Sequence, residues 1–107
     1  MEAACRGAKQ AGGTTVGILA GTDRADANEY VDIAIPTGLG QARNAVVVRA
    51  ADALVAIGGG YGTLSEIALA LRRDKHVVGL GTWDVDGVDV VESPEAAVEA
   101  VLRDLTT

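Results

Sequence analysis

Short apolar runs alternate with longer amphipathic segments along this chain. The runs are rich in Val, Ile and Ala, and they occupy residues 15–19, 30–35, 53–57 and 77–80. The segments around them space their apolar residues as helices do, at 2–11, 41–51, 63–73 and 94–105. A short apolar run is typical of a buried strand. Strands that alternate with helices at this spacing predict an α/β fold with a parallel sheet.

The ends of these segments carry residues that suit helix ends and turns. Gly12 and Gly13 follow the first helical segment and can cap its carboxyl end. Ser93 and Pro94 form a typical helix start, with Ser as the N-cap and Pro at the first helical position. Residues 81–92 contain Trp83, three Asp and two glycines, Gly81 and Gly87, and they are predicted to form a loop.

The length of 107 residues fits one domain, and we assign residues 1–107 to a single Rossmann-like domain. We expect three layers, with helices on both faces of a parallel sheet. Three or four strands make a narrow sheet, and the chain opens directly into a helix with no strand before it. We therefore expect a Rossmann-like fold that is truncated at the N-terminus, and the sequence leaves open whether residues upstream of Met1 are missing.

Composition and charge narrow the range of partners. The chain is 49% hydrophobic, which predicts a folded core, and its net charge of −6 disfavours a nucleic-acid partner. Cys5 is the only cysteine in the sequence, so no intrachain disulfide can form. No apolar run approaches the roughly 18 residues of a transmembrane helix, and the N-terminus is unlike a signal peptide. We expect a cytoplasmic protein with no membrane partner.

Residues 57–66, with the sequence IGGGYGTLSE, join the third predicted strand to the third predicted helix. Backbone N–H groups at such a junction are unpaired, the helix dipole favours negative charge, and glycine allows a phosphate to come close. The spacing fits neither a Walker A motif, which needs Lys and then Ser or Thr after the last glycine, nor the dinucleotide pattern G-x-G-x-x-G. The loop therefore predicts a phosphate site of another kind.

Polar residues near this loop allow more than one interpretation. Thr63 and Glu66 have the spacing of a capping box, and the same spacing is compatible with a catalytic role for Glu66. Arg43 begins the second helical segment, and in a parallel sheet its loop would lie not far from the glycine loop. From the residues alone, a solvated arginine is the favoured interpretation. Trp83 and Asp84 follow a strand and can rim a pocket, although a solvated loop is favoured.

The same residues carry a family resemblance. Arg43-Asn44, a helix, an apolar strand and the run GGYGTLSE at 59–66 resemble the Lonely Guy family of cytokinin riboside monophosphate phosphoribohydrolases. The signature of that "lysine decarboxylase-like" family is P-G-G-x-G-T-x-x-E, with an Arg-Lys pair upstream. Gly58, Ser65 and Asn44 depart from it, where the family has Pro, a frequent Glu and Lys.

These departures make the chain more similar to the bacterial branch that includes molybdenum-cofactor carrier proteins. Those proteins share the fold and bind a phosphate-bearing pterin without hydrolysing it. The family's first strand, first helix and second strand have no counterpart in this sequence. Since those strands help to form the base pocket in the family, the resemblance implies an incomplete pocket here.

The resemblance implies a role for each matching residue. Glu66 would lie by the ribose and stabilise the oxocarbenium-like charge as the N-glycosidic bond breaks, and Arg43 would anchor the substrate or assist the leaving group. The products would be a free base and ribose 5-phosphate, with no metal or organic cofactor. Four residues of the loop would hold the 5′-phosphate: Gly59, Gly60, Gly62 and Thr63.

Two functions stay open at this point. The matching residues favour a nucleoside 5′-monophosphate phosphoribohydrolase. The departures favour a non-catalytic carrier of molybdopterin, or another nucleotide-binding protein. In either case we expect the partner to be a small nucleotide or a phosphate-bearing pterin. We also expect a homodimer or a higher homo-oligomer, because the family forms dimers and a short sheet favours association.

Overall fold

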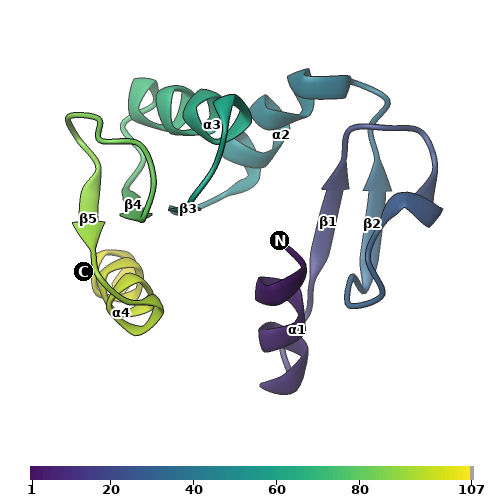
Figure 1. The fold of residues 1–107 in the computed structure, drawn as a ribbon, viewed down its shortest axis with the longest axis horizontal. Coiled ribbons are helices and arrows are strands. Elements are labelled where there is room, and N and C mark those ends of the chain that lie inside the picture. The colour runs from purple at the N-terminus through teal and green to yellow at the C-terminus, as the bar shows by residue number, and fades with distance from the viewer. Residues whose placement is uncertain (107) are drawn as a thin grey trace. The chain divides into compact units, whose positions relative to one another are not determined.

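The computed structural model describes residues 1–106 and confirms the α/β fold class, with parallel pairing in each sheet (Figure 1). Two 3₁₀ turns, η1 (Arg24–Asp26) and η2 (Gly40–Ala42), lie in the connections. The helices and strands follow in the order α1 (Glu2–Gln10), β1 (Val16–Leu19), β2 (Ile33–Pro36), α2 (Arg43–Ala50), β3 (Leu54–Ile57), α3 (Tyr61–Arg72), β4 (Val77–Leu80), β5 (Asp89–Val91) and α4 (Pro94–Thr106).

The chain divides into two units, Met1–Arg43 and Asn44–Thr107. The first unit contains a two-stranded sheet, β1-β2, and the second contains a three-stranded sheet with the order β3-β4-β5. The strands therefore fall into two sheets, where alternation along the sequence suggested one. Hydrophobic periodicity identifies the strands, but it does not say which strands become neighbours.

The second unit contains a sheet that is covered on both faces. Consecutive strand residues point to opposite faces, and both Val77 and Val78 of β4 are 0% exposed. Figure 1 shows α3 and α4 on opposite sides of β4, which gives the three layers expected of a parallel sheet. Ile67 of α3 and Ala97 of α4, each at most 1% exposed, are buried in the helices that pack on this sheet. This packing fixes the carboxyl ends of β3 and β4, where the candidate site lies.

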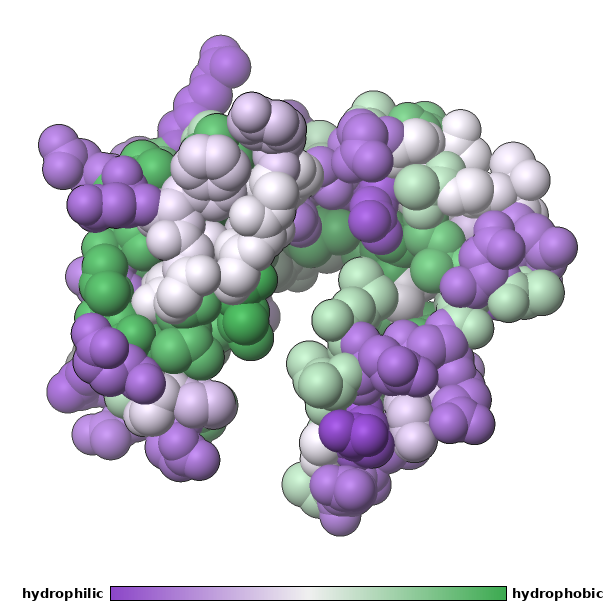
Figure 2. Space-filling model, viewed as in Figure 1, coloured by the Kyte–Doolittle hydropathy of each residue, from purple (hydrophilic) through white to green (hydrophobic). Residues whose placement is uncertain are grey.

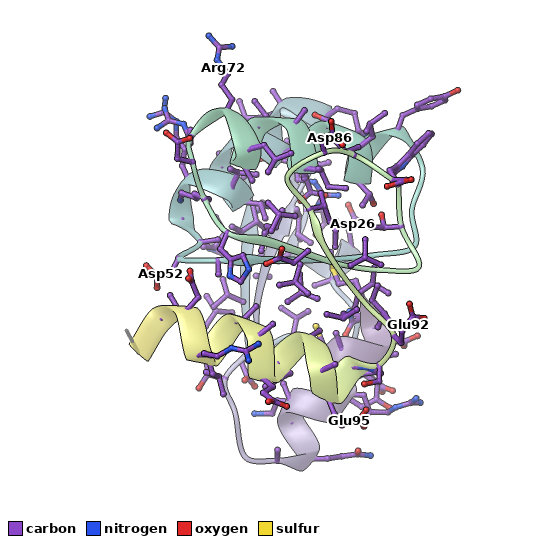
Figure 3. All side chains as sticks on the ribbon, turned by 90° about the vertical axis from the view of Figure 1, so that its left-hand side faces the viewer. Asp26, Asp52, Arg72, Asp86, Glu92 and Glu95 are labelled. Carbon is purple, nitrogen blue, oxygen red and sulfur yellow. The ribbon has the colours of Figure 1, made fainter. Side chains whose placement is uncertain are left out.

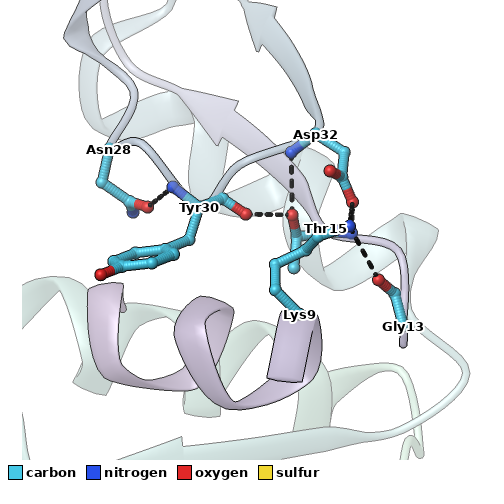
Figure 4. Close-up of polar contacts among 6 residues, drawn as sticks. All are labelled: Lys9, Gly13, Thr15, Asn28, Tyr30 and Asp32. Carbon is cyan, nitrogen blue, oxygen red and sulfur yellow. Dashed lines mark hydrogen bonds and ion pairs between the residues drawn. The ribbon is translucent and has the colours of Figure 1, made fainter. Parts of the chain in front are cut away.

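A polar cluster fixes the first unit (Figure 4). The Asp32 carboxylate accepts hydrogen bonds from the Thr15 backbone N–H and from Lys9 Nζ, both at 2.9 Å. The Thr15 hydroxyl accepts from the Asp32 N–H at 2.8 Å and donates to the Tyr30 carbonyl at 2.5 Å. These bonds lie just before the paired residues of β1 and β2, and they hold the register in which Val16 lies opposite Ile33.

Most boundaries shift by one or two residues, and three elements differ from the prediction in a way that has a clear physical reason. β2 begins at Ile33, because residues 30–32 are used in the polar cluster. The strand β5 lies within the predicted loop 81–92. Its residues are mostly exposed and include Asp89, so it lacks the apolar run that marks a buried strand. The helix α3 begins at Tyr61 rather than at Thr63.

The start of α3 also corrects the capping-box interpretation. Gly60 is the N-cap, and as a glycine it has no side chain that could cap this end of the helix. Thr63 lies within the first turn, so it is not the residue that a capping box requires at the N-cap. The predicted cap of the last helix is confirmed, because Ser93 Oγ accepts a hydrogen bond from the Ala96 N–H at 3.1 Å.

No helix within residues 1–106 is both long enough and apolar enough to span a membrane.

Candidate functional site

The glycine loop turns the chain from β3 into α3. Gly58 has φ +56° and Gly59 has φ +109°, which only glycine adopts readily. Proline, with φ fixed near −65°, cannot take the conformation of Gly58, so this loop differs physically from one that has the family's Pro at that position. Gly60 is extended, with φ −97° and ψ −151°.

The surroundings of the three glycines differ. A Cβ on Gly59 would overlap the side chain of Thr63, coming within 2.8 Å of its Cγ2 atom. A Cβ on Gly58 or Gly60 would meet no atom within 4 Å. The loop therefore packs tightly at Gly59 and has open space beside the glycines on either side of it.

Backbone N–H groups are available at the start of α3. The first hydrogen bond of the helix runs from the Leu64 N–H to the Gly60 carbonyl at 3.2 Å. The N–H groups of Tyr61, Gly62 and Thr63 precede it and have no earlier helical carbonyl to bind. The N-cap residue, Gly60, has no side chain with which to cap them. They lie at the positive end of a helix of 12 residues, which suits an anion.

The connection after β4 supports this loop from the side. The Gly58 N–H donates to the Leu80 carbonyl at 3.2 Å, which continues the pairing of β3 with β4. The Thr82 hydroxyl then donates to the Gly58 carbonyl at 2.6 Å, and Trp83 Nε1 donates to the Gly60 carbonyl at 3.0 Å. Three hydrogen bonds thus hold the glycine loop against residues 80–83.

Two hollows open at this end of the sheet. One, of about 330 Å³, is lined by Gly58, Gly59, Gly81, Thr82 and Trp83. The other, of about 360 Å³, is also lined by Gly81, Thr82 and Trp83. It continues over β5, and the rest of its lining includes Val90, Val91 and the acidic residues Asp84 and Glu92. Both lie at the carboxyl ends of parallel strands, where open α/β sheets bind ligands.

The wall formed by β5 is apolar. Val90 is 65% exposed, and Figure 2 shows hydrophobic side chains at the surface over β5. Figure 3 shows Glu92 where β5 leads into α4. The second hollow therefore combines apolar surface with carboxylates, which suits the flat face and the N–H donors of a heterocycle better than it suits a phosphate.

Five of the predicted site residues lie close together in the second unit. Gly59, Gly60, Gly62 and Thr63 lie in one loop and helix turn. Glu66 follows Thr63 by three residues, so both side chains lie on the same face of α3, and Glu66 is half-buried.

Arg43 belongs to the first unit and makes a contact there. Its Nη1 donates to the Ile18 carbonyl at 2.5 Å, and its buried Nε has no hydrogen-bond partner within residues 1–106.

The supporting connection after β4 was only weakly indicated by the sequence. From the sequence, a solvated loop is the favoured interpretation of Trp83 and Asp84. In the structure both residues line a hollow, and Trp83 forms a hydrogen bond to the glycine loop. The sequence does contain an indication that this connection belongs to the site, because Gly81 directly follows the apolar strand β4 as Gly58 directly follows β3. Both have a left-handed φ, +58° and +56°.

A separate hollow of about 550 Å³ lies between α2 and α3. It is lined by Arg49, Arg72 and Arg73 together with Ala45, Val48 and Leu69. Arg49 and Arg72 lie in the last turns of their helices, where positive charge interacts favourably with the helix dipole. Figure 3 shows Arg72 pointing away from the end of α3. Its lining shares no residue with the two hollows at the glycine loop.

Known structures resemble this chain closely. The molybdenum cofactor binding protein from the phototrophic bacterium Rippkaea orientalis is 40% identical and has a TM-score of 0.84, over 97% of this chain and 69% of that chain. The molybdenum cofactor carrier protein MCP from Chlamydomonas reinhardtii is 42% identical and has a TM-score of 0.85, with the same coverage.

Sequence comparison gives a consistent result. A protein of Archaeoglobus fulgidus with the name "Uncharacterized protein" is 48% identical over 99 residues, or 92% of this chain. The chain spans 65% of the length of that archaeal protein. The model of the SLOG cluster4 family matches residues 1–104. The chain therefore belongs to the SLOG cluster4 family.

Proposed function

We propose that this chain binds a phosphate-bearing pterin of the molybdenum-cofactor type and carries it without chemical change. The uncapped glycine loop at the start of α3 is the observation that supports the proposal most directly. It is supported further by the two solved relatives, whose names describe them as binding or carrying the molybdenum cofactor.

The phosphate would lie against the start of α3. In this proposal the backbone N–H groups from Gly59 to Thr63 donate to its oxygens, and the Thr63 hydroxyl is a further donor. The open space beside Gly58 and Gly60 admits the phosphate, which a Cβ at either position would crowd. Since these contacts come from backbone groups, they need no lysine and suit a loop that differs from Walker A.

The phosphoribohydrolase hypothesis has less support. The relatives are named as carriers, and none of the comparisons supports bond cleavage or the Lonely Guy branch. Carriage is therefore the function that we propose, and hydrolysis becomes an outcome that an experiment can detect.

Isothermal calorimetry on the full chain tests the phosphate site, with inorganic pyrophosphate and then anaerobic molybdenum cofactor as probes. The decisive variant is Gly60→Asp, because Gly60 has the extended backbone of an N-cap. A carboxylate there caps the free N–H groups and repels the phosphate, so affinity should fall by about tenfold or more while thermal stability is kept or raised.

Two control variants separate the effect of the carboxylate from the effect of adding any side chain. Gly60→Ala adds a methyl group without capping and should weaken binding with little change in fold. Gly7→Ala, in α1, also places its Cβ where no atom lies within 4 Å, and it should bind as the wild type does. Wild-type affinity in Gly60→Asp, or no binding of either probe by the unmodified chain, would contradict the proposal.

An assay for adenine released from AMP distinguishes carriage from hydrolysis. We expect only background release by the wild type and by Glu66→Ala. Release that is well above background and is lost in Glu66→Ala would support the phosphoribohydrolase instead.

The expected homodimer stays a prediction. Light scattering coupled to gel filtration measures the mass in solution, and a monomer at every concentration would contradict it.

A further inference from the structure

Trp83 and Tyr61 form a stacked aromatic pair beside the glycine loop. The chain has one Trp, two Tyr and no Phe, so two of its three aromatic residues meet at this place. Their ring centroids lie 5.8 Å apart and the ring planes differ by 28°. Tyr61 is 82% exposed, whereas Trp83 is partly buried and packs against the hydrophobic core. A partly buried indole that borders a candidate site and carries an exposed tyrosine ring suggests a contact with a ligand.

The indole of Trp83 is held in a defined position. Its Nε1 donates to the carbonyl of Gly60, the residue that also forms the N-cap of α3. Trp83 lines both hollows at the glycine loop, whereas Tyr61 is absent from their linings. Tyr61 therefore supports the indole from outside the hollows, and the indole itself borders the space that a ligand can enter.

We infer that Trp83 is the stacking surface for the flat ring of the ligand and that Tyr61 is a positioning residue that holds it. This inference rests on the proposed function and adds the part of the site that selects the ring. The phosphate occupies the N–H groups of the loop, and the ring lies on the indole. Because Nε1 bonds to Gly60, the two contacts lie next to each other, as a ligand with a ring and a phosphate requires.

The second hollow indicates which class of ring fits. Asp84 and Glu92 line it together with Val90 and Val91. A carboxylate accepts hydrogen bonds, and the pyrimidinone edge of a pterin presents a ring N–H and an amino group side by side. Adenine presents only its amino group as a donor on the corresponding edge. The lining therefore favours a pterin-type ring over adenine.

A purely structural role for the aromatic pair makes a different prediction. If Trp83 only braced the loop, its loss would weaken the phosphate contact and the ring contact together. A stacking role predicts loss of the ring contact alone. Two probes separate these cases: 6-hydroxymethylpterin, which has the ring without phosphate, and inorganic pyrophosphate, which has phosphate without the ring.

The sole tryptophan makes the wild-type experiment direct. Saturable quenching of tryptophan emission by 6-hydroxymethylpterin, corrected for absorption by the pterin, is expected to match its affinity from calorimetry. By calorimetry, Trp83→Leu should weaken pterin binding by about tenfold and leave pyrophosphate binding within about twofold. Trp83→Phe keeps a stacking face and should stay within about threefold of the wild type for the pterin.

Tyr61 provides a second, independent pair of variants. Tyr61→Ala should weaken pterin binding by a few fold and reduce the quenching, while Tyr61→Phe, which keeps the ring, should restore both. Binding of the pterin without quenching, or equal losses of pterin and pyrophosphate affinity in Trp83→Leu and Tyr61→Ala, would overturn the inference. Failure of pyrophosphate and molybdenum cofactor to bind the wild type contradicts the proposed function instead, so the two failures are distinguishable.

Discussion

At the scale of single residues, Asp32 links two segments of the first unit through one carboxylate. The hydrogen bond from the Thr15 N–H, and then the one from Lys9, hold the pKa of Asp32 below its ordinary value of about 3.9. A carboxyl group whose folded pKa is lowered contributes stability above its unfolded pKa, and this contribution is lost as the pH falls through the folded pKa. Asp32→Asn should therefore lower the melting temperature by a few degrees at neutral pH.

The pH dependence of this difference is the measurement that checks the cause. The gap in melting temperature between the wild type and Asp32→Asn should be constant above about pH 5 and should narrow below about pH 4. Asp52→Asn is a suitable control, because Asp52 is an exposed carboxylate between α2 and β3. A gap that stayed the same down to about pH 2.5 would mean that the carboxylate charge is not what stabilises the unit.

The glycine loop was the residue-scale feature that the sequence predicted best. Its chemistry is local, since three consecutive glycines between a strand and a helix expose backbone N–H groups whatever else surrounds them. The contacts of Arg43 and Trp83 could not be predicted in the same way. Arg43 binds the carbonyl of Ile18, and Trp83 binds that of Gly60, so both contacts depend on how distant segments pack.

At the scale of elements, two neighbouring glycines at the junction of β3 and α3, Gly59 and Gly60, differ in backbone conformation and in the space beside them. Gly59 has a positive φ and little space for a side chain, so Gly59→Ala should cost about 1–3 kcal/mol of unfolding free energy. Gly60 has a negative φ and open space, so Gly60→Ala should cost less, about 1 kcal/mol or below.

Urea denaturation of the two alanine variants measures this difference. We expect the Gly59→Ala midpoint to be clearly lower than that of Gly60→Ala, with similar slopes. Equal destabilisation would show that the loop relaxes to accept a Cβ at Gly59. It would contradict the conclusion that the strand-to-helix turn is tightly packed at this residue.

Elements with a strong apolar pattern were predicted closely from the sequence, and β5 was not. β4 lies in the middle of its sheet with Val77 and Val78 fully buried, so its sequence shows the run expected of a strand. β5 pairs on one side only with β4 and is largely exposed, so no such run is needed. The start of α3 at Tyr61 was missed because the helix begins at a glycine and uses no side-chain cap that the sequence could reveal.

At the scale of the whole molecule, the sequence predicted the fold class but not the division into two sheets. The α/β class follows from alternation alone, and the solved relatives share the fold. The pairing of β1 with β2, and of β3 with β4, depends on contacts between strands that periodicity does not encode.

The net charge of −6 makes the salt dependence of binding informative. A chain with this charge repels a phosphate anion at long range, and salt screens that repulsion beyond about 10 Å at 0.1 M. Backbone N–H groups at a helix start attract the phosphate only locally. Pyrophosphate affinity should therefore stay within about twofold, or rise slightly, between about 50 and 300 mM NaCl.

The arginines between α2 and α3 are an alternative anion site, and the salt dependence of pyrophosphate affinity tests whether the phosphate binds there. Binding at Arg49, Arg72 and Arg73 would depend on full positive charges at a hollow open to solvent, and it would weaken steeply as salt rises. The matched variant is Arg49→Gln with Arg72→Gln, which should leave pyrophosphate affinity and its salt dependence unchanged. A steep loss with salt that this double variant removes would move the phosphate site to the arginine hollow. An affinity that is nearly independent of salt and sensitive to Gly60→Asp would keep it at the glycine loop.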